Sequence, residues 1–330
     1  SHFTALPQRA IIILSTVFSL ALLSGCLPSL SSLSQNRPPV GAPANAPSIA
    51  PYAGKVALDG RILAVKDGSI WLWAGGTFKP LASGARYSCP AWSPDGKRIV
   101  ATVVGENHSD LVLLDGVRGK LKQLTDNWSS RRVQDCAWAR SPAWSPDGQQ
   151  IAFASDRRGS HTELWIIDAE SGENARVLDS PAGVSDVDYV SWSPSGQRLA
   201  VTGFDGAVGQ IFVVDLVTGR WAQLTESPEG ALQPAWSPDG EKIAFVRRDQ
   251  GRSDLWLMKV DGSEQTAITK DGTANAPTWS PNGDLIAYLA GVPCSDLHVI
   301  SSDAGSTDGK GQALTSGAAI ETTSRLSWTR

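Results

Sequence analysis

The stretch Ala91-Trp92-Ser93-Pro94-Asp95-Gly96 decides the fold, because the chain repeats it. Close copies begin at residues 143, 191, 235 and 278, and Ser327-Trp328 starts another copy at the C-terminal end of the sequence. The Trp residues of successive copies are 52, 48, 44, 43 and 49 residues apart. A period of about 40–50 residues, with turn signals inside each unit, is typical of β-propeller blades.

Each repeat contains more than its turn. A β-branched, apolar run such as residues 98–101 follows the turn, and a Leu or Ile comes 32 to 35 residues after each Trp. No segment has a sustained helical period. Pro presets φ for a tight turn, Asp bonds the nearby backbone, and Gly accepts the left-handed position. We therefore predict an all-β fold of four-stranded antiparallel blades, with these indoles packed between blades: Trp92, Trp144, Trp192, Trp236, Trp279 and Trp328.

The two ends of the repeat region complete one another. Residues 58–83 contain a turn followed by three strand-like runs but no inner strand, whereas residues 326–328 supply an inner strand alone. Pairing the two would close the ring and leave no open edge. The sequence therefore predicts a closed six-bladed propeller, with these blades: 324–330 plus 54–83, 88–125, 140–179, 188–225, 232–269 and 275–315.

Tandem Trp-Ser-Pro-Asp-Gly repeats resemble those of the TolB-type propellers, also described as WD-like propellers. The resemblance covers residues 54–330. It implies a binding platform of the bacterial cell envelope, one face of which recognises a protein or cell-wall partner without catalysis. TolB itself carries an α/β domain before its propeller, and here a proline-rich stretch stands in that place.

The N-terminal residues have the pattern of an export signal. Arg9 precedes an uncharged, apolar run over residues 10–23, which is too short for a comfortable membrane span of about 20 residues. The following Leu23-Ser24-Gly25-Cys26 resembles a bacterial lipobox, which implies a signal peptide over residues 1–26 and a lipid on Cys26. Residues 27–53, rich in Pro and Ser, are predicted to be a flexible tether. An ordinary signal peptide and an uncleaved anchor are the alternatives.

Composition narrows the classes of partner. Lys plus Arg number 29 against 33 Asp plus Glu, for a net charge of −4, and nucleic-acid binders normally have a basic excess. We expect an exported, lipid-anchored monomer that faces the periplasm or the cell surface. We expect neither a nucleic acid, a cofactor nor a metal ion among its ligands.

An enzyme is the alternative function. A peptidase of the prolyl-oligopeptidase type needs a Gly-x-Ser-x-Gly nucleophile elbow, and the sequence has no such pentapeptide. A propeller lyase or hydrolase acting on glycans would need convergent acids or histidines. His108 and His161 fall at similar places in adjacent blades, but both lie in polar, Gly-flanked tips, so solvated hairpin residues are the favoured explanation.

Loop positions give a candidate binding face. The link from Leu124 to Trp144 is 20 residues long, the longest between blades, and it is rich in Trp and Arg. Such a composition is typical of interaction surfaces, although a loop that folds back over its own channel would look the same. We predict an envelope protein, a peptide or a glycan bound by Arg86, Tyr87, Trp128, Arg131, Arg132, Trp138, Arg140, Asp186, Asp188 and Tyr189. We also predict a disulfide between Cys89 and Cys136, which map to this face.

Overall fold

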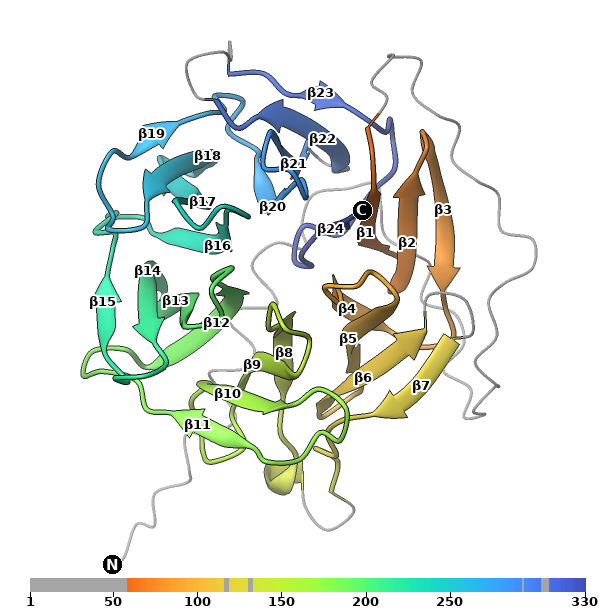
Figure 1. The fold of residues 1–330 in the computed structure, drawn as a ribbon, viewed down its shortest axis with the longest axis vertical. Coiled ribbons are helices and arrows are strands. Elements are labelled where there is room, and N and C mark those ends of the chain that lie inside the picture. The colour runs from red at the N-terminus through yellow and green to blue at the C-terminus, as the bar shows by residue number, and fades with distance from the viewer. Residues whose placement is uncertain (1–57, 116–118, 130–132, 293, 304–308) are drawn as a thin grey trace, which may run out of the picture.

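The computed structural model describes residues 58–330 except 116–118, 130–132, 293 and 304–308. These described residues form six four-stranded antiparallel sheets, which are arranged as blades around a central axis (Figure 1). The prediction of an all-β, six-bladed propeller is confirmed. The predicted signal peptide, Cys26 and the tether lie outside the described residues. Within the described part of the chain, no helix is long and apolar enough to cross a membrane.

Each blade has its first strand beside the axis and its fourth strand at the rim of the ring. From the axis outward, blade 1 contains β24 (Ser327–Thr329), β1 (Arg61–Lys66), β2 (Ser69–Ala74) and β3 (Thr77–Ala82). Blade 2 contains β4 (Tyr87–Trp92), β5 (Arg98–Val104), β6 (Ser109–Asp115) and β7 (Gly119–Gln123). Blade 3 contains β8 (Ala139–Trp144), β9 (Gln150–Ser155), β10 (Glu163–Asp168) and β11 (Arg176–Leu178), and a 3-10 turn, η2 (Val133–Asp135), precedes it.

The remaining blades follow the same plan. Blade 4 contains β12 (Asp186–Trp192), β13 (Arg198–Asp205), β14 (Val208–Asp215) and β15 (Trp221–Gln223). Blade 5 contains β16 (Ala231–Trp236), β17 (Lys242–Asp249), β18 (Arg252–Lys259) and β19 (Thr266–Ala267). Blade 6 contains β20 (Asn275–Trp279), β21 (Leu285–Ala290), β22 (Asp296–Ser301) and β23 (Gln312–Ala313).

The C-terminal strand closes the ring, as predicted. β24 pairs with β1 in an antiparallel register that sets Ser327 opposite Leu63 and Thr329 opposite Arg61. The last strand therefore shares a sheet with the first, and each blade packs against two neighbours (Figure 1).

The repeated turn is held by its own side chains. In blade 2 the Ser93 hydroxyl donates to Asp95 Oδ1 at 2.6 Å, and it accepts from the Arg98 backbone N–H at 2.9 Å. Gly96 has a φ of 65°, a conformation that favours glycine. The Asp95 pKa is lowered, mainly by the Ser93 hydrogen bond. The motif therefore fixes the hairpin between the first and second strands.

The apolar core lies between blades. Six buried clusters within the described residues each join residues of two neighbouring blades, such as Trp144 with Val100 and Leu113. The Trp144 indole also donates to the Ala91 carbonyl of the blade before it, at 3.1 Å. Trp192 and Trp279 repeat this bond at 3.0 and 2.9 Å. The repeat Trp residues are 6–9% exposed in blades 2 to 6, whereas Trp328 is half-buried.

Candidate binding face

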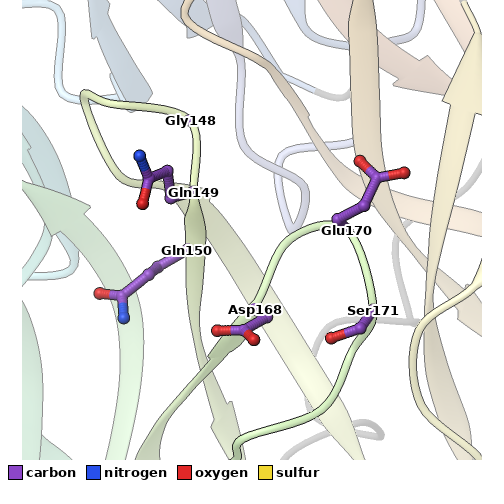
Figure 2. A pocket seen from close by; sticks show the side chains of 6 residues that line it. All are labelled: Gly148, Gln149, Gln150, Asp168, Glu170 and Ser171. Carbon is purple, nitrogen blue, oxygen red and sulfur yellow. The ribbon is translucent and has the colours of Figure 1, made fainter.

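The links between strands divide the ring into two faces. The Ser-Pro-Asp-Gly turns share one face with the links between third and fourth strands, because Gly148 and Gln149 of one lie beside Glu170 and Ser171 of the other (Figure 2). We call this the turn face. In a meander the remaining links, including those between blades, lie on the opposite face. We call that the mouth face.

The long link before blade 3 presents an aromatic side chain on the mouth face. Trp128 is 58% exposed, the most exposed aromatic residue in the described part of the chain. The residue before it is fixed, because Asn127 accepts and donates hydrogen bonds on several sides. Its backbone N–H donates to Asp110 Oδ1 at 2.8 Å, and its side-chain amide donates to the Ser109 carbonyl at 2.7 Å. The exposed indole therefore stands on an ordered base.

Two arginines contact residues close to Trp128 in the sequence, Asn127 and Trp138. Arg157 donates through Nε to Asn127 Oδ1 at 2.9 Å, and the Arg140 guanidinium lies 6.0 Å from the Trp138 ring. We call Trp128, Trp138, Arg140 and Arg157 the tryptophan–arginine patch. The Trp138 backbone N–H donates to Asp156 Oδ1 at 2.7 Å. Burial raises the Asp156 pKa, and this hydrogen bond and the Arg140 charge oppose the rise.

Other predicted mouth residues lie at three different places. Arg86 is exposed, and Asp186 accepts from the Thr162 backbone N–H at 2.8 Å on the neighbouring blade. Asp188 and Tyr189 lie nearer the axis, in the inner strand β12. Arg131 and Arg132 lie outside the described residues.

Tyr87 was wrongly assigned to the mouth. It is 1% exposed and packs in the cluster between blades 1 and 2, where burial raises its pKa. In blades 2 to 6 the fifth residue before the repeat Trp faces a neighbouring blade, and small or apolar residues usually fill the position: Ala139, Val187, Ala231 and Ala274, each 0–1% exposed. Tyr87 fills the same position with a larger side chain.

The predicted Cys89–Cys136 disulfide is not formed, and both thiols are free. Cys89 is buried beside the axis, with its sulfur 3.9 Å from the Ser141 hydroxyl. Cys136 lies in the long link, where its sulfur accepts from the Ser129 backbone N–H at 3.3 Å. Sharing a face did not bring the two residues together, because one belongs to an inner strand and the other to a surface link.

A ring of bulges surrounds the axis. The third residue before the repeat Trp has positive φ, between 48° and 58°, in Cys89, Ser141, Tyr189, Gln233 and Ala276. At each of these places the inner strand gains one residue relative to its partner. Such a bulge redirects a side chain, here toward the axis. Arg325 holds the equivalent position before Trp328 in the closing strand.

Hydrogen bonds join the ring from blade to blade. The Cys89 backbone N–H donates to the Ser324 hydroxyl of blade 1 at 2.8 Å. The Ser141 hydroxyl donates to Asp188 Oδ1 at 2.5 Å. The Gln233 side chain hydrogen-bonds Tyr189 and accepts from the Ala276 backbone N–H at 2.7 Å. The Tyr189 pKa is raised, first by burial and then by the Asp188 charge.

Arg325 crosses the axis. Its guanidinium donates to the Val190 carbonyl of blade 4, and to the Pro234 carbonyl of blade 5 at 3.2 Å. Burial lowers the Arg325 pKa, and the nearby Cys89 and Asp188 act in the opposite direction. Sequence reasoning missed both Arg325 and Gln233. The signal that would have found them is their shared position, three residues before a repeat Trp.

The two histidines considered as metal ligands stand apart. His108 Nε2 lies 3.7 Å from Asp110 Oδ2, and His161 Nδ1 lies 3.6 Å from Asp186 Oδ2. No group of three His, Cys, Asp or Glu residues within the described part of the chain is placed to hold a metal ion.

Comparisons with known proteins agree with this geometry. Residues 184–325 match the family model described as a TolB beta propeller domain. TolB from Acinetobacter baumannii superposes with a TM-score of 0.61 at 21% identity, over 82% of this chain and 66% of that one. A putative TolB from Agrobacterium tumefaciens gives 0.63 at 18% identity, over 82% and 97% of the two chains. The chain therefore has a TolB-like propeller.

A curated relative from Bacillus subtilis has an enzymatic name. The uncharacterized peptidase YuxL is 31% identical over an alignment of 140 positions, which covers 32% of this chain. The chain spans only 21% of the length of that relative. The similarity is therefore confined to a small part of the named peptidase.

Proposed function

We propose that this protein is a non-catalytic binding protein of the bacterial cell envelope, which recognises a protein or peptide partner through its mouth face. The observation that carries the proposal is the tryptophan–arginine patch. Tyr, Trp and Arg dominate the binding energy of protein interfaces, because they combine large apolar area with directional hydrogen bonds. In the patch Trp128 is exposed and follows the hydrogen-bonded Asn127, to which Arg157 donates, and Arg140 lies over the Trp138 ring.

The charge of the patch favours an acidic segment of the partner. Arg140 and Arg157 are exposed, and neither forms an ion pair with a carboxylate within the described residues. Asp156 lies close to Arg140 and offsets part of that charge. The partner peptide would therefore place an aromatic or aliphatic side chain against Trp128 and a carboxylate beside the two arginines.

We propose further that export and lipidation of Cys26 place the propeller at the membrane, with residues 27–53 as its tether. The support is the Leu-Ser-Gly-Cys sequence after an apolar run. Metabolic labelling with a radioactive fatty acid tests this directly. Label incorporated by the parent and absent from Cys26→Ser supports the anchor, whereas equal labelling of both refutes it.

The binding proposal is tested by crosslinking the tagged protein in its native envelope. The test variant is Trp128→Ala with Arg140→Ala. The control is Val217→Ala with Arg220→Ala, which also removes one exposed apolar residue and one exposed arginine, but from the turn face. The proposal predicts one partner that is captured by the parent and the control and lost from the test variant. A partner captured equally by all three proteins would overturn the assignment of the face.

A further inference from the structure

Cation–π pairs recur at the junctions between blades on the turn face. The first residue of a second strand reaches the repeat Trp of the next blade. The Arg61 guanidinium lies 4.5 Å from the Trp92 ring centre. The corresponding distances are 5.1 Å from Arg98 to Trp144 and 5.1 Å from Arg198 to Trp236. The chain thus covers these indoles with its own arginines.

The junction of blades 3 and 4 departs from this pattern. Gln150 begins β9, so the residue that faces Trp192 carries no charge. A pocket of about 380 Å³ lies here, lined by Gln150, Trp192 and the two adjoining turns. The turn of blade 4 also has Ser195 where Asp or Asn stands in the other repeats. The second strands of blades 5 and 6 begin with Lys242 and Leu285, so these two junctions have no arginine at this position either.

One carboxylate lines this pocket. Asp147 lines it, and its pKa is lowered by hydrogen bonds from the Ser145 hydroxyl and the Gln149 backbone N–H. A second pocket of about 530 Å³ adjoins it, shares Gln150 and adds Asp168 (Figure 2). Neither Asp147 nor Asp168 has an ion-pair partner within the described residues. Trp192, which is 9% exposed and has no arginine of its own chain over it, therefore lies beside negative charge.

We propose that this junction binds the side chain of an arginine from a partner polypeptide, with its guanidinium over Trp192. The geometry is that of the chain's own pairs, in which Arg61 also donates through Nη2 to the Gly96 carbonyl at 2.8 Å. Gly196, the equivalent glycine, lines the pocket. Asp147 supplies the carboxylate that a guanidinium favours. The site lies on the face opposite the tryptophan–arginine patch, so it does not depend on the proposed function.

The test uses N-acetyl-arginine-N-methylamide as the probe, with the citrulline analogue as a neutral probe of the same shape. Binding is followed through the Trp indole N–H resonances of the full chain, and the Trp192 resonance is assigned with Trp192→Phe. Gln150→Arg gives the chain its own cation at this junction. The matched variant Arg198→Gln removes the cation from Trp236 and places a Gln at the equivalent position of the next junction.

The proposal predicts a saturable shift of the Trp192 resonance with the arginine probe and at least tenfold weaker binding of the citrulline probe. Gln150→Arg should lose the shift, and Arg198→Gln should gain one at Trp236. Unchanged binding by Gln150→Arg would overturn the proposal, as would equal shifts with both probes. Tighter binding of tetramethylammonium than of the arginine probe would also overturn it, because the occupant would then be a small cation.

Discussion

Replacing Arg325 by Met should destabilise the propeller, although it removes a buried charge. The change leaves the Val190 and Pro234 carbonyls, both in buried residues, without their donor. Hydrogen bonds from charged groups contribute about 1.5–3 kcal/mol each, and two are lost. Removing the desolvated guanidinium offsets part of this loss. We expect a net loss of about 3 kcal/mol in the free energy of unfolding.

Thermal and urea unfolding measure this loss. At about 2–4 °C per kcal/mol for a domain of this size, the melting temperature should fall by about 6–12 °C. The stability of Arg325→Lys should lie between those of the parent and Arg325→Met, because a single ammonium group lacks the planar guanidinium that reaches both carbonyls. Arg220→Met, at an exposed position, is the control and should change stability by less than about 0.5 kcal/mol. If Arg325→Met is as stable as this control, the bonds across the axis do not stabilise the ring.

Three further predictions concern the turns, the pH response and the thiols. Gly172→Ala should cost at least about 1 kcal/mol in urea unfolding, because its Cβ would lie 2.2 Å from the Leu124 carbonyl oxygen at a φ of 76°; no loss would contradict the packing. The Ser237 hydrogen bond lowers the Asp239 pKa, so this group stabilises the fold above its unfolded pKa, and the effect is lost as pH falls through the native value. Asp239→Asn should therefore weaken the dependence of the free energy of unfolding on pH below about pH 4. The turn itself should tolerate the change, because Asn282 holds the same position in blade 6. A pH dependence identical to that of the parent would refute this. Peptide mapping under oxidising conditions should give no Cys89–Cys136 linked peptide, and its recovery in full yield would contradict the free thiols.

The fold could be predicted because the same local sequence pattern recurs several times along the chain. Turn residues, strand runs and the interblade indole recur together, and an incomplete first blade matches a lone last strand. A Thr follows the fourth-strand Leu or Ile in blades 2, 4, 5 and 6. In blade 2 it joins two strands, because Thr125 donates to Asp110 at 2.8 Å and accepts from the Leu111 backbone N–H at 2.9 Å. Blade 3 lacks that Thr, and Arg158 joins Glu163 to Asp179 instead.

The candidate site was only partly predictable. Loop length indicated the link that carries Trp128, because a longer link must leave the ring surface. Side-chain direction within the inner strands was not predictable, since a bulge before the repeat Trp of blades 2 to 6 changes which residues face the axis. Tyr87 was therefore assigned to the mouth while it lies between blades, and Arg325 was overlooked.

The most direct test of the binding account is photo-crosslinking from single positions. A photoreactive phenylalanine replaces Trp128 in one protein and Val217 in another, so that the two probes lie on opposite faces. The account predicts that irradiation in the native envelope joins a discrete partner to the protein probed at position 128. The protein probed at position 217 should not form that product. The same product from both positions, or from position 217 alone, would contradict recognition through the mouth face.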